Sequence, residues 1–191
     1  MTGAAKPRVT LKLATSLDGK IALANGKSKW ITGPESRAVV HRMRAAHDAI
    51  LTGVGTIIAD DPEFTARTDP MPEKQPDVIV LDRTGRMPMG ARVFAGEGRQ
   101  VMLRAGADIT AALEGYDRVM IEAGARIAAA ALKAGIVDTI EWFRAPKLLG
   151  GDGLSVIAGL GLESLDAAPI FRRIGIVERG NDIQETYERI R

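Results

Sequence analysis

Three short runs of apolar residues constrain the fold of this chain more than any other feature. Residues 48–52, 77–82 and 118–121 are largely apolar and do not alternate with polar residues. Strands of this composition are buried on both faces, which is typical of a parallel sheet covered by helices. Residues 100–103 form a weaker run of the same kind. The pattern therefore predicts an α/β fold.

The segments between and after these runs predict the remaining elements. Residues 8–14 alternate as a half-buried strand should, and Thr32-Gly33-Pro34-Glu35 predicts a helix to about residue 47, with Thr32 as N-cap and Glu35 completing a capping box. Further along lie an expected helix, strand and hairpin, over residues 124–133, 136–144 and 170–189. We expect a mixed, mostly parallel central sheet flanked by helices, with a C-terminal antiparallel hairpin.

Composition bounds the organisation of the chain and the kinds of site it can hold. A chain of 191 residues fits one domain, predicted over residues 8–191 after a flexible N-terminus, residues 1–7. With no cysteine and only two histidines, His41 and His47, a bound metal is not expected, and carboxylate-bound Mg²⁺ is the one alternative left open. A net charge of +2 gives no reason to expect nucleic-acid binding. No apolar run is long enough for a membrane span and no secretory signal is visible, so we expect a cytoplasmic protein.

Two glycine-containing turns follow predicted strands, where ligands gather in an open parallel sheet. Gly53-Val54-Gly55-Thr56 offers close backbone approach and a hydroxyl, and Gly124 opens a helix whose free N–H groups favour an anion. The first is not a complete G-x-G-x-x-G motif, because Ile58 stands in place of the third glycine. On chemistry alone, glycines in such a run more commonly serve a tight turn.

Several charged side chains have both a structural and a functional interpretation. Asp60, Asp61 and Arg67 could form an acidic pair and an anion site, or lie on a solvated loop. Arg37, His41 and Arg44 share one helix face, which on general grounds is more often solvated. Glu122 ends a buried run at a helix start, where a carboxylate has few structural reasons to occur.

Trp30 is the most unusual aromatic residue of the chain. A single tryptophan is usually part of a core, because its side chain is a large apolar group. Its neighbours Gly26, Lys27, Ser28, Lys29 and Gly33 are loop residues. The ring is therefore expected to cover a ligand.

Long stretches of the chain resemble a known reductase family. V-T-L-K-L-A-T-S-L-D-G-K-I-A, S-K-W-I-T-G and H-R-M-R-A-A-H-D-A-I-L-T-G-V-G-T-I-I-A-D-D-P-E-F-T-A-R resemble the reductase domain of bacterial riboflavin biosynthesis, 5-amino-6-(5-phosphoribosylamino)uracil reductase. I-E-A-G-A-R-I-A-A-A-A-L-K-A-G-I-V-D and A-P-K-L-L-G-G-D-G continue the match. The resemblance implies a fold similar to dihydrofolate reductase. It also implies NADPH-dependent reduction of the substrate's ribosyl group to a ribityl chain.

The resemblance also implies roles for individual residues. Combined with the two turns described above, it gives a set of candidate cofactor contacts. They are Ala14, Trp30, Gly53, Thr56, Asp60, Arg83 and the helix start over residues 124–130, which begins with Gly124, Ala125, Arg126 and Ile127. Candidate substrate contacts are Ser28, Arg44, Phe64 through its backbone, Arg67 and Glu122. Asp60 and Glu122 are the candidate proton-transfer groups, and Lys12 is a candidate for orienting the substrate. Arg83 could serve the 2′-phosphate of NADPH.

The family resemblance carries further expectations about partners. Many members are fused to a zinc deaminase, whose H-x-E and P-C-x-x-C signature does not occur in these residues, so deamination is expected from a separate protein. Members are commonly homodimers. Two alternatives stay open: a reductase of the same fold acting on a pterin, dihydrofolate or another heterocycle, and a non-catalytic nucleotide-binding protein. Arg44 and Arg67 favour a phosphorylated sugar over an uncharged pteridine.

Overall fold

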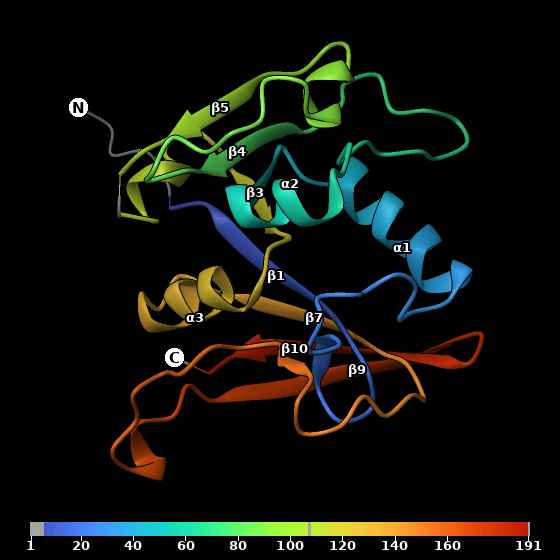
Figure 1. The fold of residues 1–191 in the computed structure, drawn as a ribbon, viewed down its shortest axis with the longest axis vertical. Helices are drawn as coiled ribbons and strands as arrows, with labels where there is room; N and C mark the ends of the chain where they lie inside the picture. Colours follow the sequence, from blue (N-terminus) through green and yellow to red (C-terminus); the bar gives the residue numbers. More distant parts are fainter. Residues whose placement is uncertain (1–5, 107, 191) are drawn as a thin grey trace. The chain divides into compact units, whose positions relative to one another are not determined.

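The computed structural model describes residues 6–106 and 108–190 (Figure 1). The chain divides into two units, here called unit 1 (Met1–Val9 and Ala38–Ala123) and unit 2 (Thr10–Arg37 and Gly124–Arg191). Most of the predicted flexible N-terminus, residues 1–7, lies outside the described residues. The expectation of a single domain over residues 8–191 stays a prediction.

Unit 1 is built on four parallel strands in the order β5 (Val101–Arg104), β4 (Asp77–Leu81), β3 (Ala49–Gly53) and β6 (Arg118–Ile121). The side chains of β3 are all buried, and those of β4 and β6 nearly all. Strands without polar alternation thus occupy the positions that the sequence predicted for them.

A helix that the sequence analysis missed follows β3 directly. The predicted turn at Gly53 is the start of α2 (Val54–Asp60), with Gly53 in extended conformation at the N-cap. Val54 and Ile57, three residues apart, pack in the core of unit 1 with Ile50 and Val80. This i, i+3 pair of apolar residues explains the helix, because it buries one face of a short turn. Unit 1 also contains two short 3-10 helices, η1 (Arg92–Ala95) and η2 (Ala111–Leu113).

Unit 2 contains a mixed group of strands. β1 (Arg8–Thr15), whose first two residues fall in unit 1, pairs parallel with β7 (Thr139–Arg144). β10 (Asp182–Arg189) pairs antiparallel with both β7 and β9 (Phe171–Arg179), so the predicted C-terminal hairpin is confirmed. β2 (Lys20–Ala22) and β8 (Leu154–Ser155) form a separate two-stranded sheet. The remaining elements are α3 (Ala125–Lys133) and η3 (Leu165–Ala167).

The predicted cap of the first helix is wrong by one residue. Helix α1 (Pro34–Ala45) begins after Gly33, so Thr32 is not its N-cap. The carboxylate of Asp182 instead accepts the Gly33 N–H at 2.6 Å and the Ser36 hydroxyl at 2.6 Å. A buried side chain from β10 therefore satisfies the helix start, and Glu35 is not needed for that purpose.

The strands are mixed and mostly parallel, with an antiparallel C-terminal pair, as predicted. The largest difference in a strand boundary is at β7, which begins at Thr139: the buried Ile136 and Val137 precede it outside any strand. Within the described residues, no helix combines the length and the apolar character that a membrane crossing requires.

Candidate functional site

An ion pair at the end of β6 is the centre of the candidate substrate site in unit 1. Glu122 follows β6, and its N–H donates to the Leu51 carbonyl of β3 at 3.0 Å. The Arg44 guanidinium, from α1, donates Nε to Glu122 Oε2 at 3.0 Å and Nη2 to Oε1 at 2.8 Å. The two side chains are only 13% and 15% exposed. This bidentate pair is therefore shielded from solvent, which fixes the orientation of both groups.

The backbone of residues 63–67 lies against the same arginine. Arg44 Nη1 donates to the Thr65 carbonyl at 3.1 Å, and the Arg44 guanidinium lies 5.5 Å from the centre of the Phe64 ring. Phe64 is buried and has a φ of 54°, a left-handed conformation that is uncommon outside glycine. The predicted substrate residues Arg44, Phe64 and Glu122 are thus brought together.

His41 joins this group, although the sequence analysis only weighed it as part of a polar helix face. Its Nδ1 lies 3.0 Å from the Thr65 carbonyl, and its Nε2 lies 3.3 Å from Arg67 Nη2. Burial, followed by the positive charges of Arg44 and Arg67, lowers the pKa of His41 below its usual 6.5. The imidazole is therefore suited to stay neutral near pH 7.

Arg67 is the most accessible predicted substrate residue of this group. Its side chain is 56% exposed and pairs with Glu63 Oε2 at 2.7 Å, while the other Glu63 oxygen accepts from Arg92. The hydrogen bond from Arg92 is the main reason that the pKa of Glu63 lies below its usual value. Arg44 and Arg67 were expected to be open forks for a sugar phosphate. The structure shows each already paired with a carboxylate.

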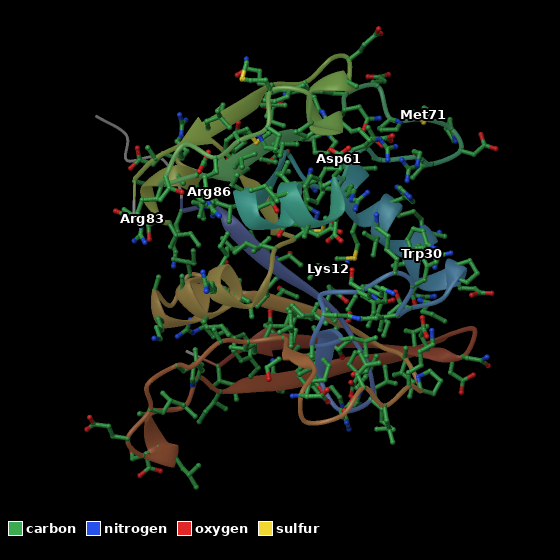
Figure 2. All side chains as sticks on the ribbon, viewed as in Figure 1. Lys12, Trp30, Asp61, Met71, Arg83 and Arg86 are labelled. Atoms are coloured by element: carbon green, nitrogen blue, oxygen red, sulfur yellow. The ribbon has the colours of Figure 1, made fainter. Side chains whose placement is uncertain are left out.

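The other predicted residues of unit 1 lie on α2 and after β4. Thr56 is in the first turn of α2, and Asp60 is its last residue. Asp61 is exposed and accepts the Arg92 N–H at 2.9 Å, so the two aspartates do not form a buried acidic pair. Arg83 is exposed in the turn after β4 (Figure 2).

The turn that carries Arg83 is ordered by its neighbour. Burial acts to raise the pKa of the Asp82 carboxyl. Hydrogen bonds from the backbone N–H groups of Arg86, Met87 and Thr84 outweigh this effect and lower the pKa. One of these is the bond from Met87 N to Asp82 Oδ2 at 2.8 Å.

Unit 2 presents Trp30 at its surface (Figure 2). The side chain is 65% exposed, so the ring does not fill the core, and its role in covering a ligand stays a prediction. The Arg37 guanidinium lies 4.5 Å from the centre of the ring, and Lys147 Nζ donates to the Trp30 carbonyl at 2.8 Å. Ser28, on the same loop, is half-buried.

Two predicted residues lie on β1. Lys12 and Ala14 project to the same side of the strand, since they are two residues apart. Lys12 is in register with Glu141 of β7. Lys12 is also labelled in Figure 2.

The predicted cofactor residues from Gly124 to Ile127 form the N-terminus of α3. Gly124 is the N-cap, in extended conformation, and no side chain of residues 6–106 or 108–190 caps the helix. A Cβ atom added to Gly124 would meet nothing within 4 Å, so the space directly beside Gly124 is open. An uncapped helix N-terminus with open space beside its N-cap residue fits a phosphate group.

Asp18 is a well-anchored residue of unit 2 that the sequence analysis did not single out. Its carboxylate accepts the Ser16 hydroxyl at 2.6 Å and the Gly150 N–H at 2.8 Å. The Ser16 bond, with the backbone N–H groups of Leu149 and Gly150, lowers the pKa of Asp18 to about 2. Asp18 thereby holds the loop that also carries Lys147, and no local sequence pattern indicates this pairing.

No group of three histidine, aspartate or glutamate side chains that could hold a metal occurs among residues 6–106 and 108–190.

Comparison with protein families gives a match over most of the chain. A family model described as the RibD C-terminal domain matches residues 7–184. The riboflavin biosynthesis protein RibD of Aquifex aeolicus is 36% identical over 210 residues, which cover 96% of this chain and 58% of that protein. The chain thus spans less than two thirds of this relative's length.

Solved structures agree with the sequence comparison. RibD of Acinetobacter baumannii, form 1, is similar with a TM-score of 0.88 and 29% identity, over 97% of this chain and 59% of that one. Dihydrofolate reductase from Enterococcus faecalis, described as complexed with NADP(H), has a TM-score of 0.62 at 17% identity, over 96% and 97% of the two chains. The second likeness shows the fold alone, and it confirms the predicted dihydrofolate reductase-like fold.

Proposed function

Since the chain belongs to the RibD C-terminal domain family, we propose that it reduces the ribosyl group of 5-amino-6-(5-phosphoribosylamino)uracil to the ribityl form with NADPH. The observation that carries this proposal is the shielded Arg44–Glu122 pair beside the 63–67 segment. It places a carboxylate and two further polar side chains, His41 and Arg67, in one part of unit 1.

The geometry divides the work between the two arginines. Arg44 is largely buried and donates from both Nε and Nη2 to Glu122, so we assign it to orienting that carboxylate. Arg67 is exposed, and its partner Glu63 has a second cation in Arg92. A substrate phosphate can therefore bind Arg67 in place of Glu63, because Glu63 keeps its ion pair with Arg92. Arg67 is our candidate for the phosphate contact.

The cofactor assignment rests on α3 together with the family. The uncapped helix start at Gly124, with open space beside this residue, fits the pyrophosphate of a dinucleotide. Ala125, Arg126 and Ile127 supply the first-turn backbone. The exposed Trp30 ring offers an apolar face for a planar group. Bound NADPH would supply the hydride.

The chain's own residues would move the protons of this reaction. Opening the sugar breaks the C1′–O4′ bond, so O4′ gains a proton and the exocyclic nitrogen loses one. When C1′ of the resulting imine accepts the hydride, that nitrogen regains a proton. Glu122 and Asp60 are the proposed groups that carry these protons, and Lys12 is proposed to orient the substrate. The deaminase that prepares the substrate lies outside these 191 residues.

We also propose that the protein acts as a cytoplasmic homodimer. On the β9–β10 hairpin, Ile174, Ile176 and Ile183 are exposed. The register pairs Ile176 with Glu185 and Ile183 with Glu178, which places Ile176 and Ile183 on the same face. Exposed apolar residues on a hairpin at the end of the strand order support pairing with a second copy.

The test is NADPH oxidation by the purified protein, measured as the loss of NADPH absorbance. The phosphorylated ribosylaminouracil is compared with its unphosphorylated form and with dihydrofolate. Turnover confined to the phosphorylated substrate is expected. Turnover of dihydrofolate alone would replace this proposal with a pterin reductase. NADPH binding without turnover of any of the three would argue for a non-catalytic nucleotide-binding protein.

A further inference from the structure

Arg99, which precedes β5, reaches the backbone of the candidate site from outside it. Its Nη2 donates to the carbonyl of Glu63 and, at 2.7 Å, to the carbonyl of Val93 in η1. We propose that Arg99 is a positioning residue: it fixes the 63–65 backbone and, through Thr65, holds Arg44 on Glu122. This inference rests on the proposed function only for its kinetic consequence.

The environment of Arg99 is costly for a charged side chain. Its Nε and Nη1 atoms are buried, and neither has a hydrogen-bond partner among the described residues. Burial, followed by the nearby charge of Arg44, lowers the pKa of Arg99 below its usual value. Unsatisfied buried N–H groups oppose stability. We therefore look for the role of Arg99 in the hydrogen bonds that it does make, from Nη2 to the carbonyls of Glu63 and Val93.

The contact acts on a backbone that needs support. Glu63, whose carbonyl Arg99 holds, is followed directly by Phe64 in the left-handed conformation. A non-glycine residue stays in this conformation only where its surroundings hold it. On the other side of Phe64, the Thr65 carbonyl accepts from Arg44 and lies against His41. Pinning the carbonyl at residue 63 therefore sets where the carbonyl at residue 65 meets Arg44.

Gly96 provides the space in which the Arg99 guanidinium lies. A Cβ atom added to Gly96 would lie 2.6 Å from both Cζ and Nη2 of Arg99. The φ of Gly96 is −75°, which alanine readily adopts, so Gly96→Ala would displace Arg99 without straining the backbone. Gly90 offers a matched control, because a Cβ there meets nothing within 4 Å.

The first test is structural and needs no activity. His41 and His47 are the only histidines, so their ring signals can be followed separately by NMR. Arg99→Ala and Gly96→Ala are expected to shift the His41 signals and leave those of His47 in place, while Gly90→Ala shifts neither. If Arg99→Ala fails to fold, Gly96→Ala decides. Unchanged His41 signals in the folded variants would overturn the positioning role.

The second test is kinetic. Arg99→Ala and Gly96→Ala are expected to lower kcat about tenfold, because Arg44 would orient the proton-transfer group Glu122 less well, and to leave KM for NADPH unchanged. Millimolar guanidinium should restore Arg99→Ala, whereas ammonium, which lacks the planar fork, should not. A rise in KM for NADPH as well, without rescue by guanidinium, would show a general structural effect and contradict the proposal. Shifted His41 signals in a protein without reductase activity would keep the positioning role and refute the proposed function.

Discussion

The pairing of Glu122 with Arg44 makes its charge the property to test first. Glu122→Gln keeps the shape of the side chain but removes the negative charge and one acceptor of the Arg44 fork. We expect kcat to fall by about a hundredfold or more, the usual effect of losing a group that transfers a proton. The measurement is steady-state turnover alongside thermal unfolding. Full activity in a folded Glu122→Gln variant would remove Glu122 from the mechanism.

Arg67 and Arg92 form a natural pair of test and control, because both bind the carboxylate of Glu63. Arg67→Ala is expected to raise KM for the phosphorylated substrate about tenfold, since a charge-assisted contact to phosphate is lost. Arg92→Ala should raise it much less, as Arg92 is assigned no substrate contact. The same KM in wild type and Arg67→Ala, or equal increases in both variants, would show that Arg67 does not bind the phosphate.

At the scale of elements, Asp18 connects the turn after β1 to the loop after β7 through Leu149 and Gly150. Its pKa is about 2 in the folded protein against a usual 3.8, so the folded state binds this proton more weakly than the unfolded state. The stabilisation is therefore present above pH 3.8 and is lost as the pH falls through about 2.

Asp18→Asn should accordingly flatten the stability profile in that acid range, measured by urea unfolding at a series of pH values. Asp152→Asn, at an exposed position of the same loop, serves as the control and should keep the wild-type slope. Parallel profiles for wild type and Asp18→Asn would show that this carboxylate does not couple the two loops.

The elements differ in how well the sequence predicted them. The buried strands β3, β4 and β6 were identified because short apolar runs without alternation are typical of strands covered on both faces. Helix α2 was missed because seven residues are too few to show a helical period, and Gly53 and Gly55 suggested a turn. The start of α1 was placed one residue too early, since the carboxylate at this helix start comes from Asp182, 149 residues after Gly33.

The same distinction applies to the candidate site. Local sequence marked Glu122 as unusual, and family resemblance selected Arg44, Phe64 and Arg67. Neither could show that Arg44 would be engaged by Glu122, because this contact joins residues 78 positions apart. Arg99 had no recognisable signal, as its role depends on backbone carbonyls at Glu63 and Val93 that only the folded chain brings within reach.

At the scale of the whole molecule, the open question is assembly. The hairpin of β9 and β10 is the last element of the strand order, and Ile176 and Ile183 are 52% and 39% exposed on one of its faces. An edge with exposed apolar side chains favours association unless another chain covers it. The proposed homodimer predicts a solution mass of twice 20.4 kDa by sedimentation.

Replacing Ile176 and Ile183 together with lysine should convert this dimer to a monomer, because two charged side chains in place of apolar ones would have to lose their water at the interface. Leu165→Lys is the matched control: Leu165 is an equally apolar, 92% exposed residue, but it lies in η3 and not in the hairpin. It should stay dimeric. A wild-type protein that sediments as a monomer would refute the dimer, and a dimeric double variant would move the interface to another surface. Dissociation caused by Leu165→Lys as well would extend the interface beyond the hairpin.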